Sequence, residues 1–118
     1  MSSKKDHLAK AEHDERFVEF VGSASPFLDW AITATFYAAL HYVEAYFASV
    51  GRHSPDHRAR DSSIRRDPKI SSIYDDYSEL KNHSVNARYY MHRFRSEDLD
   101  VTLKPHLEAI KTHIKRLL

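Results

Sequence analysis

Two arginine–histidine pairs carry the residue types needed to cleave RNA without a metal ion. Arg52 and His57 are separated by four residues, and Arg88 and His92 are separated by three. Such cleavage needs a group that takes a proton from the 2′-hydroxyl and a cation that stabilises the charged phosphorane. Histidine transfers protons near neutral pH, and the planar guanidinium of arginine pairs with phosphate oxygens. On a helix, Arg88 and His92 share one face.

Aromatic side chains surround the second pair, in the segment RYYMHRF. Tyr89, Tyr90 and Phe94 could stack on unpaired bases. A plainer interpretation is that such pairs arise by chance in a chain with 18 Lys and Arg and nine His. Arg88 could then bond carbonyl groups at a helix end, and the two tyrosines could be half-buried core. The plainer interpretation is favoured over catalysis, but less strongly over some form of anion binding.

Other catalytic and metal-binding patterns are absent from the sequence. It contains no GxGxxG, P-loop, HExxH or GxSxG motif. His53 and His57 stand four residues apart near Asp56 and Asp61, but a histidine-rich polar segment is more often solvated surface. His41, which lies among alanines, is expected to be a satisfied core or interface histidine rather than a ligand. We therefore predict no metal site and no cofactor.

Positive charge is concentrated in two stretches of this 118-residue chain, whose overall net charge is only +1. Residues 52–69 include six Lys and Arg against three Asp, and residues 81–95 include four Lys and Arg with no acid. Together the two stretches carry +7, which leaves −6 for the rest. Segregated charge of this kind is informative about binding partners rather than about fold.

The cellular compartment is predicted from what the sequence lacks. There are no cysteines, so neither a disulfide framework nor a thiolate metal site can form. No apolar run follows the N-terminal lysines, and a secretory signal is therefore not predicted. We expect a single cytoplasmic domain covering residues 1–118.

The stretch 29–50 predicts the central helix of an all-α bundle. Its bulky stripe consists of Phe36, Leu40, Val43, Phe47 and Val50. Another face carries the small residues Ala31, Ala34, Thr35, Ala38, Ala45 and Ala48. Alanines let a second backbone approach closely, so we expect packing by the chain itself and by a second copy. A membrane span is the rival interpretation, and the charged, histidine and tyrosine residues of this stretch disfavour a membrane span.

Further helices are predicted on either side of this central one. Residues 4–22 form an amphipathic helix, and Asp29 is the expected N-cap of the central helix. A polar insertion at 52–67 is either a short helix, begun by Ser54 before Pro55, or a partly ordered loop. The Asp67–Pro68 step opens the next helix, and a last apolar stripe runs from Leu99 to Leu117. Pro105 falls in its first turns or at a kink.

Three segments give the chain a resemblance to the HEPN superfamily of small all-α domains. They are FYAALHYVEAYFASVG, HSPDHRARD and YSELKNHSVNARYY, within a likeness that covers roughly residues 7–115. The resemblance implies an up-and-down bundle of four to five helices that pairs as a symmetric homodimer. Many members are metal-independent ribonucleases, often toxins neutralised by a partner nucleotidyltransferase, and others only bind nucleotides, RNA or protein.

The family's catalytic pattern is an arginine followed, after four to six residues, by a histidine near the junction of the third and fourth main helices. Arg88 and His92 match the position with a spacing of three, whereas Arg52 and His57 match the spacing but lie in the insertion. The resemblance therefore implies Arg88 and His92 as catalytic residues. The predicted binding residues are Arg52, His57, Arg60, Ser84 and Tyr89.

We thus expect an HEPN-like homodimer that binds RNA or another phosphate-bearing ligand, and no membrane association. Its enzymatic version is a metal-independent endoribonuclease of toxin–antitoxin or defence type, with a nucleotidyltransferase antitoxin as partner. The alternative is a non-catalytic interaction or scaffold module. The sequence leaves open whether the chain is an enzyme.

Overall fold

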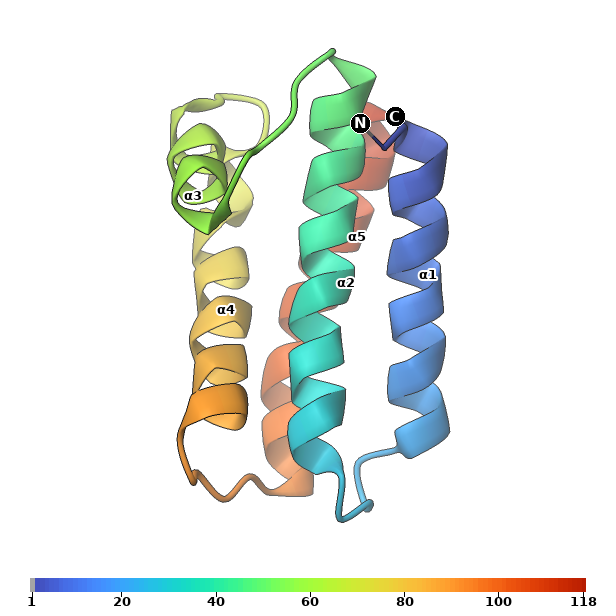
Figure 1. Cartoon of the computed structure of the whole chain (residues 1–118), viewed down its shortest axis with the longest axis vertical. Coiled ribbons are helices and arrows are strands. Elements are labelled where there is room, and N and C mark those ends of the chain that lie inside the picture. The colour runs from blue at the N-terminus through green and yellow to red at the C-terminus, as the bar shows by residue number, and fades with distance from the viewer. Residues whose placement is uncertain (1) are drawn as a thin grey trace.

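Helix α2 (Leu28–Ser49) runs through the centre of the computed structural model, which describes residues 2–118. Helices α1 (Lys4–Val21), α4 (Tyr74–Tyr89) and α5 (Lys104–Leu117) run alongside it in alternating directions (Figure 1). The short helix α3 (His57–Arg66) lies beside α4. No β-strand occurs among the described residues, so the predicted all-α bundle is confirmed. None of these helices combines the length and apolarity needed to cross a membrane.

The bulky stripe of α2 forms the centre of the core. Phe36, Val43 and Phe47 are buried, and the ring of Phe36 packs edge-on against Tyr77 of α4 with centroids 5.4 Å apart. The last predicted stripe is buried except for Leu117 at its end, and apolar side chains before and within α4 are also inside; the buried residues are Ile70, Ile73, Tyr77, Leu80, Leu99, Leu103, Leu107, Ile110 and Ile114. Each such side chain stabilises the fold by about 1.5–3 kcal/mol through burial.

The alanine face of α2 is covered by α1 of the same chain. Ala31, Ala38 and Ala45 are completely buried. Viewed down the axis of α2, these alanines lie between His41 and Tyr42, and the side chains of both of these residues contact α1. The close backbone approach that these alanines permit is therefore made within one chain, and these three are not available to a second copy.

Three predicted helix starts, at Asp29, Ser54 and Asp67, are wrong. Helix α2 begins at Leu28, and Asp29 lies in its first turn rather than at the N-cap. The N-cap of α3 is Asp56, not Ser54, because the Asp56 carboxylate accepts a hydrogen bond from the Ala59 amide at 2.7 Å. The insertion is thus a helix rather than a loop.

Asp67 does not open the following helix. It follows the last residue of α3, and its carboxylate accepts a hydrogen bond from the Lys69 amide at 2.9 Å, which favours a turn. A short 3₁₀ turn, η1 (Ser71–Ile73), then leads into α4. At the last helix a π-helical turn, η2 (Asp98–Leu103), runs directly into α5, and Pro105 lies in the first turn of α5, just after this wider turn.

Helix α4 ends before it reaches His92. The backbone becomes extended at Tyr90, so the predicted shared helical face of Arg88 and His92 is wrong. Tyr89, Tyr90 and Met91 are all exposed, and another helical turn here would gain no packing to stabilise it.

Candidate functional site

Arg88 lies in the last turn of α4, and its guanidinium is held in place by two neighbours. Nε donates to the Ser84 carbonyl at 3.2 Å, Nη1 donates to the Tyr37 hydroxyl at 2.7 Å, and Nη2 lies 3.4 Å from Ser84 Oγ. The guanidinium also lies over the ring of Tyr37 at 5.5 Å and that of Tyr89 at 5.1 Å. Since arginine has five N–H donors, one donor on each terminal nitrogen stays free for a ligand.

The charge of Arg88 is not neutralised by a carboxylate anywhere in the described chain. Three other cations of the basic stretches have such partners: Arg52 pairs with Asp67, Arg60 with Glu44, and Lys81 with Asp61. A fixed, half-buried guanidinium with two free donors and no counter-charge is the arrangement that binds a phosphate or carboxylate in a bidentate way.

His57 lies on the same side of the bundle as Arg88, connected to it through aromatic rings. The His57 ring is 6.1 Å from Phe36, and Phe36 is 5.3 Å from Tyr37, which carries the Arg88 hydrogen bond. Burial lowers the pKa of His57, and the positive charges of Arg60, Lys81 and Arg88 lower it further. His57 is therefore neutral at pH 7.

The tautomer of His57 follows from its neighbour. Arg60 Nη1 lies 3.0 Å from His57 Nδ1, and a guanidinium can only donate. Nδ1 therefore accepts, and the proton of the neutral ring is on Nε2. In this state His57 offers an N–H donor to an anion, and its only lone pair is already occupied.

Arg60 and Ser84, both predicted as binding residues, position other groups instead. The Arg60 guanidinium lies 2.7 Å from the Glu44 carboxylate, and both side chains are more than nine-tenths buried. Ser84 is fully buried and donates to the Lys81 carbonyl while its own carbonyl accepts from Arg88. Arg60 fixes His57, and Ser84 fixes Arg88.

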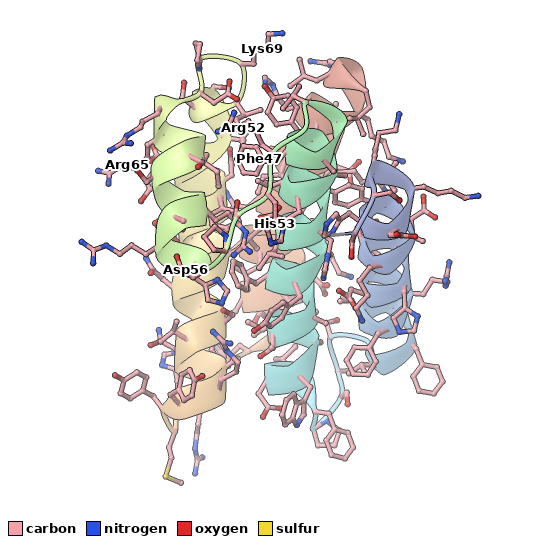
Figure 2. The ribbon with its side chains drawn as sticks, turned by 45° about the horizontal axis from the view of Figure 1, so that its top comes forward. Phe47, Arg52, His53, Asp56, Arg65 and Lys69 are labelled. Atoms are coloured by element: carbon pink, nitrogen blue, oxygen red, sulfur yellow. The ribbon has the colours of Figure 1, made fainter. Side chains whose placement is uncertain are left out.

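Arg52 is placed at the other end of the bundle from the end of α4. Its guanidinium lies 3.0 Å from Asp67 and 4.7 Å from the Phe47 ring centroid, near the end of α2 (Figure 2). Burial opposes ionisation of Asp67, but hydrogen bonds from the Lys69 amide, Tyr46 and Arg52 outweigh it and lower its pKa. Arg52 therefore serves a structural cluster, and the structure does not bring it to Arg88.

His92 is likewise separate from the Arg88 guanidinium. Its ring packs against Phe94 with centroids 4.5 Å apart, in the segment after α4. It lines an open cavity of about 590 Å³ together with Asp29, Tyr90 and other residues of this end of the bundle. No hydrogen bond joins His92 to Arg88 among residues 2–118.

Tyr37 is the site residue that the sequence analysis did not identify. It lies half-buried on α2, about 100° around the helix from the buried Phe36, packed against the core and lining a space shared with α1. Its place at the edge of the buried stripe was the only indication in the sequence, because its hydrogen bond with Arg88 depends on tertiary structure.

The two basic stretches lie on one side of the molecule because α3 lies beside α4 (Figure 1). Arg65 points outward from α3 (Figure 2), and its guanidinium is 5.1 Å from the Tyr74 ring. We call the group formed by Arg88, Tyr37, Ser84, His57 and Arg60 the Arg88 site. It lies within this positively charged side.

Metal ligands do not converge in the described part of the chain, where no three His, Asp or Glu side chains are arranged to hold an ion. The ring of His41 is satisfied by its own chain, since its Nδ1 lies 3.1 Å from Nδ1 of His7. Compared with known proteins, the sequence matches no protein-family model and no curated relative. The function must therefore be inferred from the Arg88 site itself.

Proposed function

We propose that this chain is an HEPN-like domain that binds single-stranded RNA, with a backbone phosphate held between Arg88 and the Nε2–H of His57. The observation that carries the proposal is the guanidinium of Arg88, which is fixed by Tyr37 and Ser84 and has no carboxylate partner in residues 2–118. Phosphate contacts dominate the affinity of proteins for nucleic acids, and a preset guanidinium makes such a contact at little entropic cost.

Exposed aromatic side chains beside the Arg88 site support RNA rather than an isolated phosphate. Tyr89 and Tyr90 are exposed at the end of α4, next to Arg88 in the chain. Base stacking on such rings contributes about 1–3 kcal/mol per base and tolerates any sequence. The proposed ligand is therefore a short unpaired segment whose bases reach these rings.

The geometry supports binding more strongly than cleavage. Cleavage needs a group that accepts the 2′-hydroxyl proton, and the one lone pair of neutral His57 is occupied by Arg60. His92 contacts Phe94 instead of the Arg88 guanidinium. A ribonuclease reaction by Arg88 and His92 would require the segment after α4 to rearrange around bound RNA.

A homodimer is part of this proposal. The buried alanines of α2 no longer argue for it, but Tyr89, Tyr90 and Met91 form an exposed apolar group next to Arg88. A second copy packed near this group would bring two Arg88 sites toward one groove. The nucleotidyltransferase partner remains a prediction from the family resemblance alone.

A test on labelled RNA separates binding from cleavage. Purified protein is incubated with a fluorescent single-stranded RNA in excess chelator, beside the double variant Arg88→Ala, His92→Ala. We expect wild-type protein to bind intact RNA and the variant to bind it more weakly. Cleavage by wild type alone would instead establish the enzymatic version, and equal binding by both proteins would contradict the proposal.

A non-catalytic interaction module is the second candidate, and a different surface favours it. Phe20 and Phe27 are exposed near the connection between α1 and α2, away from the basic side. Exposed aromatic clusters of this kind mark protein contacts. Binding of a partner protein that is weakened by Phe20→Ser and Phe27→Ser, with RNA affinity independent of salt, would support this candidate over the first.

A further inference from the structure

A cavity of about 410 Å³ lies between α1 and α2. It shares only the ring of Tyr37 with the Arg88 site. Its aromatic walls are Phe17, Trp30 and Tyr37. Phe17 is 41% exposed and Trp30 is 57% exposed, so a large part of each ring is accessible to a ligand. We call this space the aromatic cavity. Its volume suits a small organic ligand.

A buried carboxylate lines the same cavity. Asp14 of α1 is only 7% exposed, and its Oδ2 atom is buried without a hydrogen-bond partner in residues 2–118. Its Oδ1 atom lies 3.2 Å from Nζ of Lys10, whose side chain is half exposed. A buried carboxylate oxygen that lacks a donor is costly, and a positive charge nearby offsets that cost.

The sign of the charge decides what the aromatic cavity can hold. The faces of aromatic rings are electron-rich and attract cations, and the Asp14 carboxylate adds to that attraction. An anion would be repelled by both. A neutral apolar ligand would fill the space but would add no positive charge to that of the half-exposed Lys10, the ion-pair partner of Asp14.

The hydrogen-bonding groups of the aromatic cavity narrow the type of cation. The Tyr37 hydroxyl already accepts from Arg88, Nδ1 of His41 is paired with His7, and Asp14 Oδ1 is occupied by Lys10. The remaining Asp14 oxygen, Oδ2, is buried, so it adds negative charge but no exposed acceptor for the three N–H groups of a primary ammonium. A quaternary ammonium has no N–H group and needs only ring faces and a nearby negative charge.

We propose that the aromatic cavity binds a trimethylammonium group between Phe17, Trp30 and Tyr37, with Asp14 supplying the counter-charge. The group could belong to a free choline-like molecule or to a trimethylated lysine side chain. The proposal goes beyond RNA binding and does not depend on it, because no residue of the Arg88 site other than Tyr37 lines this cavity.

The single tryptophan of the chain makes the test direct. Trp30 is the only tryptophan, so its fluorescence reports on the aromatic cavity alone. Choline is titrated beside 3,3-dimethylbutan-1-ol, in which carbon replaces the charged nitrogen. We expect a saturable change with choline and at least roughly fivefold weaker binding of the neutral analogue, as loss of a cation–π interaction implies. Equal affinities would overturn the proposal.

Variants with opposite expected signs strengthen the test. Asp14→Asn removes the counter-charge and should weaken choline binding, whereas Lys10→Gln removes a competing cation and should tighten it. Phe17→Leu should weaken binding roughly fivefold. Phe20→Leu is the matched control, because Phe20 is on the same helix, 89% exposed, and does not line the cavity. Circular dichroism melting confirms that each variant is folded.

The outcomes distinguish the two sources of the ligand. A peptide carrying trimethyllysine that binds at least roughly tenfold more tightly than choline points to a protein side chain, and equal affinities point to a free small molecule. No saturable change up to about 50 mM of either probe would overturn the proposal. So would weakening by Phe20→Leu to the same extent as by Phe17→Leu.

Discussion

The guanidinium of Arg60 lies 2.7 Å from the carboxylate of Glu44, and the pair is buried where α3 meets α2. Burying two charges is costly, so each of these buried charges is tolerated only because the other neutralises it. Because Arg60 also donates to His57, this ion pair fixes a group of the Arg88 site from inside the protein.

Removing one partner of this pair should destabilise the fold strongly. Glu44→Gln leaves the Arg60 charge buried without compensation, and we expect the free energy of unfolding to fall by about 3–5 kcal/mol. Urea denaturation measures it. Glu12→Gln, at an exposed glutamate of α1, is the control and should change the value by less than about 0.5 kcal/mol. A Glu44→Gln loss no larger than that of the control would show that the pair contributes nothing.

Acid should loosen the contact between α1 and α2. Burial lowers the pKa of His7 and of His41 from the ordinary value of 6.5, and their Nδ1 atoms share one proton across 3.1 Å. The unfolded chain therefore takes up protons that the folded chain resists. Stability should be full above about pH 6.5 and should fall as the pH is lowered through the folded-state pKa values.

The variants His7→Gln and His41→Gln should flatten this pH dependence. The measurement is the melting temperature between pH 7.5 and pH 5, as an approximate range that spans the ordinary histidine pKa. His13→Gln, at an exposed histidine of α1, should leave the slope unchanged. A slope that is the same in all four proteins would contradict the assigned role of the pair.

His57 should act in RNA binding as a donor and not as a base. In His57→Gln the amide N–H can stand near the position of Nε2, so affinity for single-stranded RNA should stay within about threefold of wild type. His57→Ala loses the donor and should weaken binding by roughly fivefold or more. Fluorescence anisotropy measures both. If the glutamine variant is as weak as the alanine variant, the donor role is wrong.

Much of the fold was predictable from the sequence because it depends on periodicity. Most of the stripe predicted for α2 and most of the last apolar stripe are buried, although Val50 and Leu117 at their ends are exposed, and the all-α class is confirmed. Helix starts were less predictable, because several side chains compete for the same amides. Asp56, not Ser54, accepts the hydrogen bond that caps α3. Asp67 accepts a hydrogen bond from the Lys69 amide within a turn and does not start a helix.

The candidate site was only partly predictable, for a physical reason. The sequence identified Arg88, Ser84, His57 and Arg60, all of them close to one another in the structure. It could not show that Tyr37, 51 residues before Arg88, completes the site. Nor could it show that Arg52 is neutralised by Asp67, since ion pairing depends on tertiary contacts.

The most direct measurement is the salt dependence of single-stranded RNA affinity for wild type, Arg88→Gln and the control Arg65→Gln. Arg65 is also an exposed arginine of the basic side, but it lies on the outer face of α3. We predict that Arg88→Gln lowers affinity roughly tenfold and reduces the log–log slope by about 0.7, the loss of one phosphate contact, while Arg65→Gln changes either much less. Equal effects of the two substitutions, or none from Arg88→Gln, would contradict the proposed phosphate site.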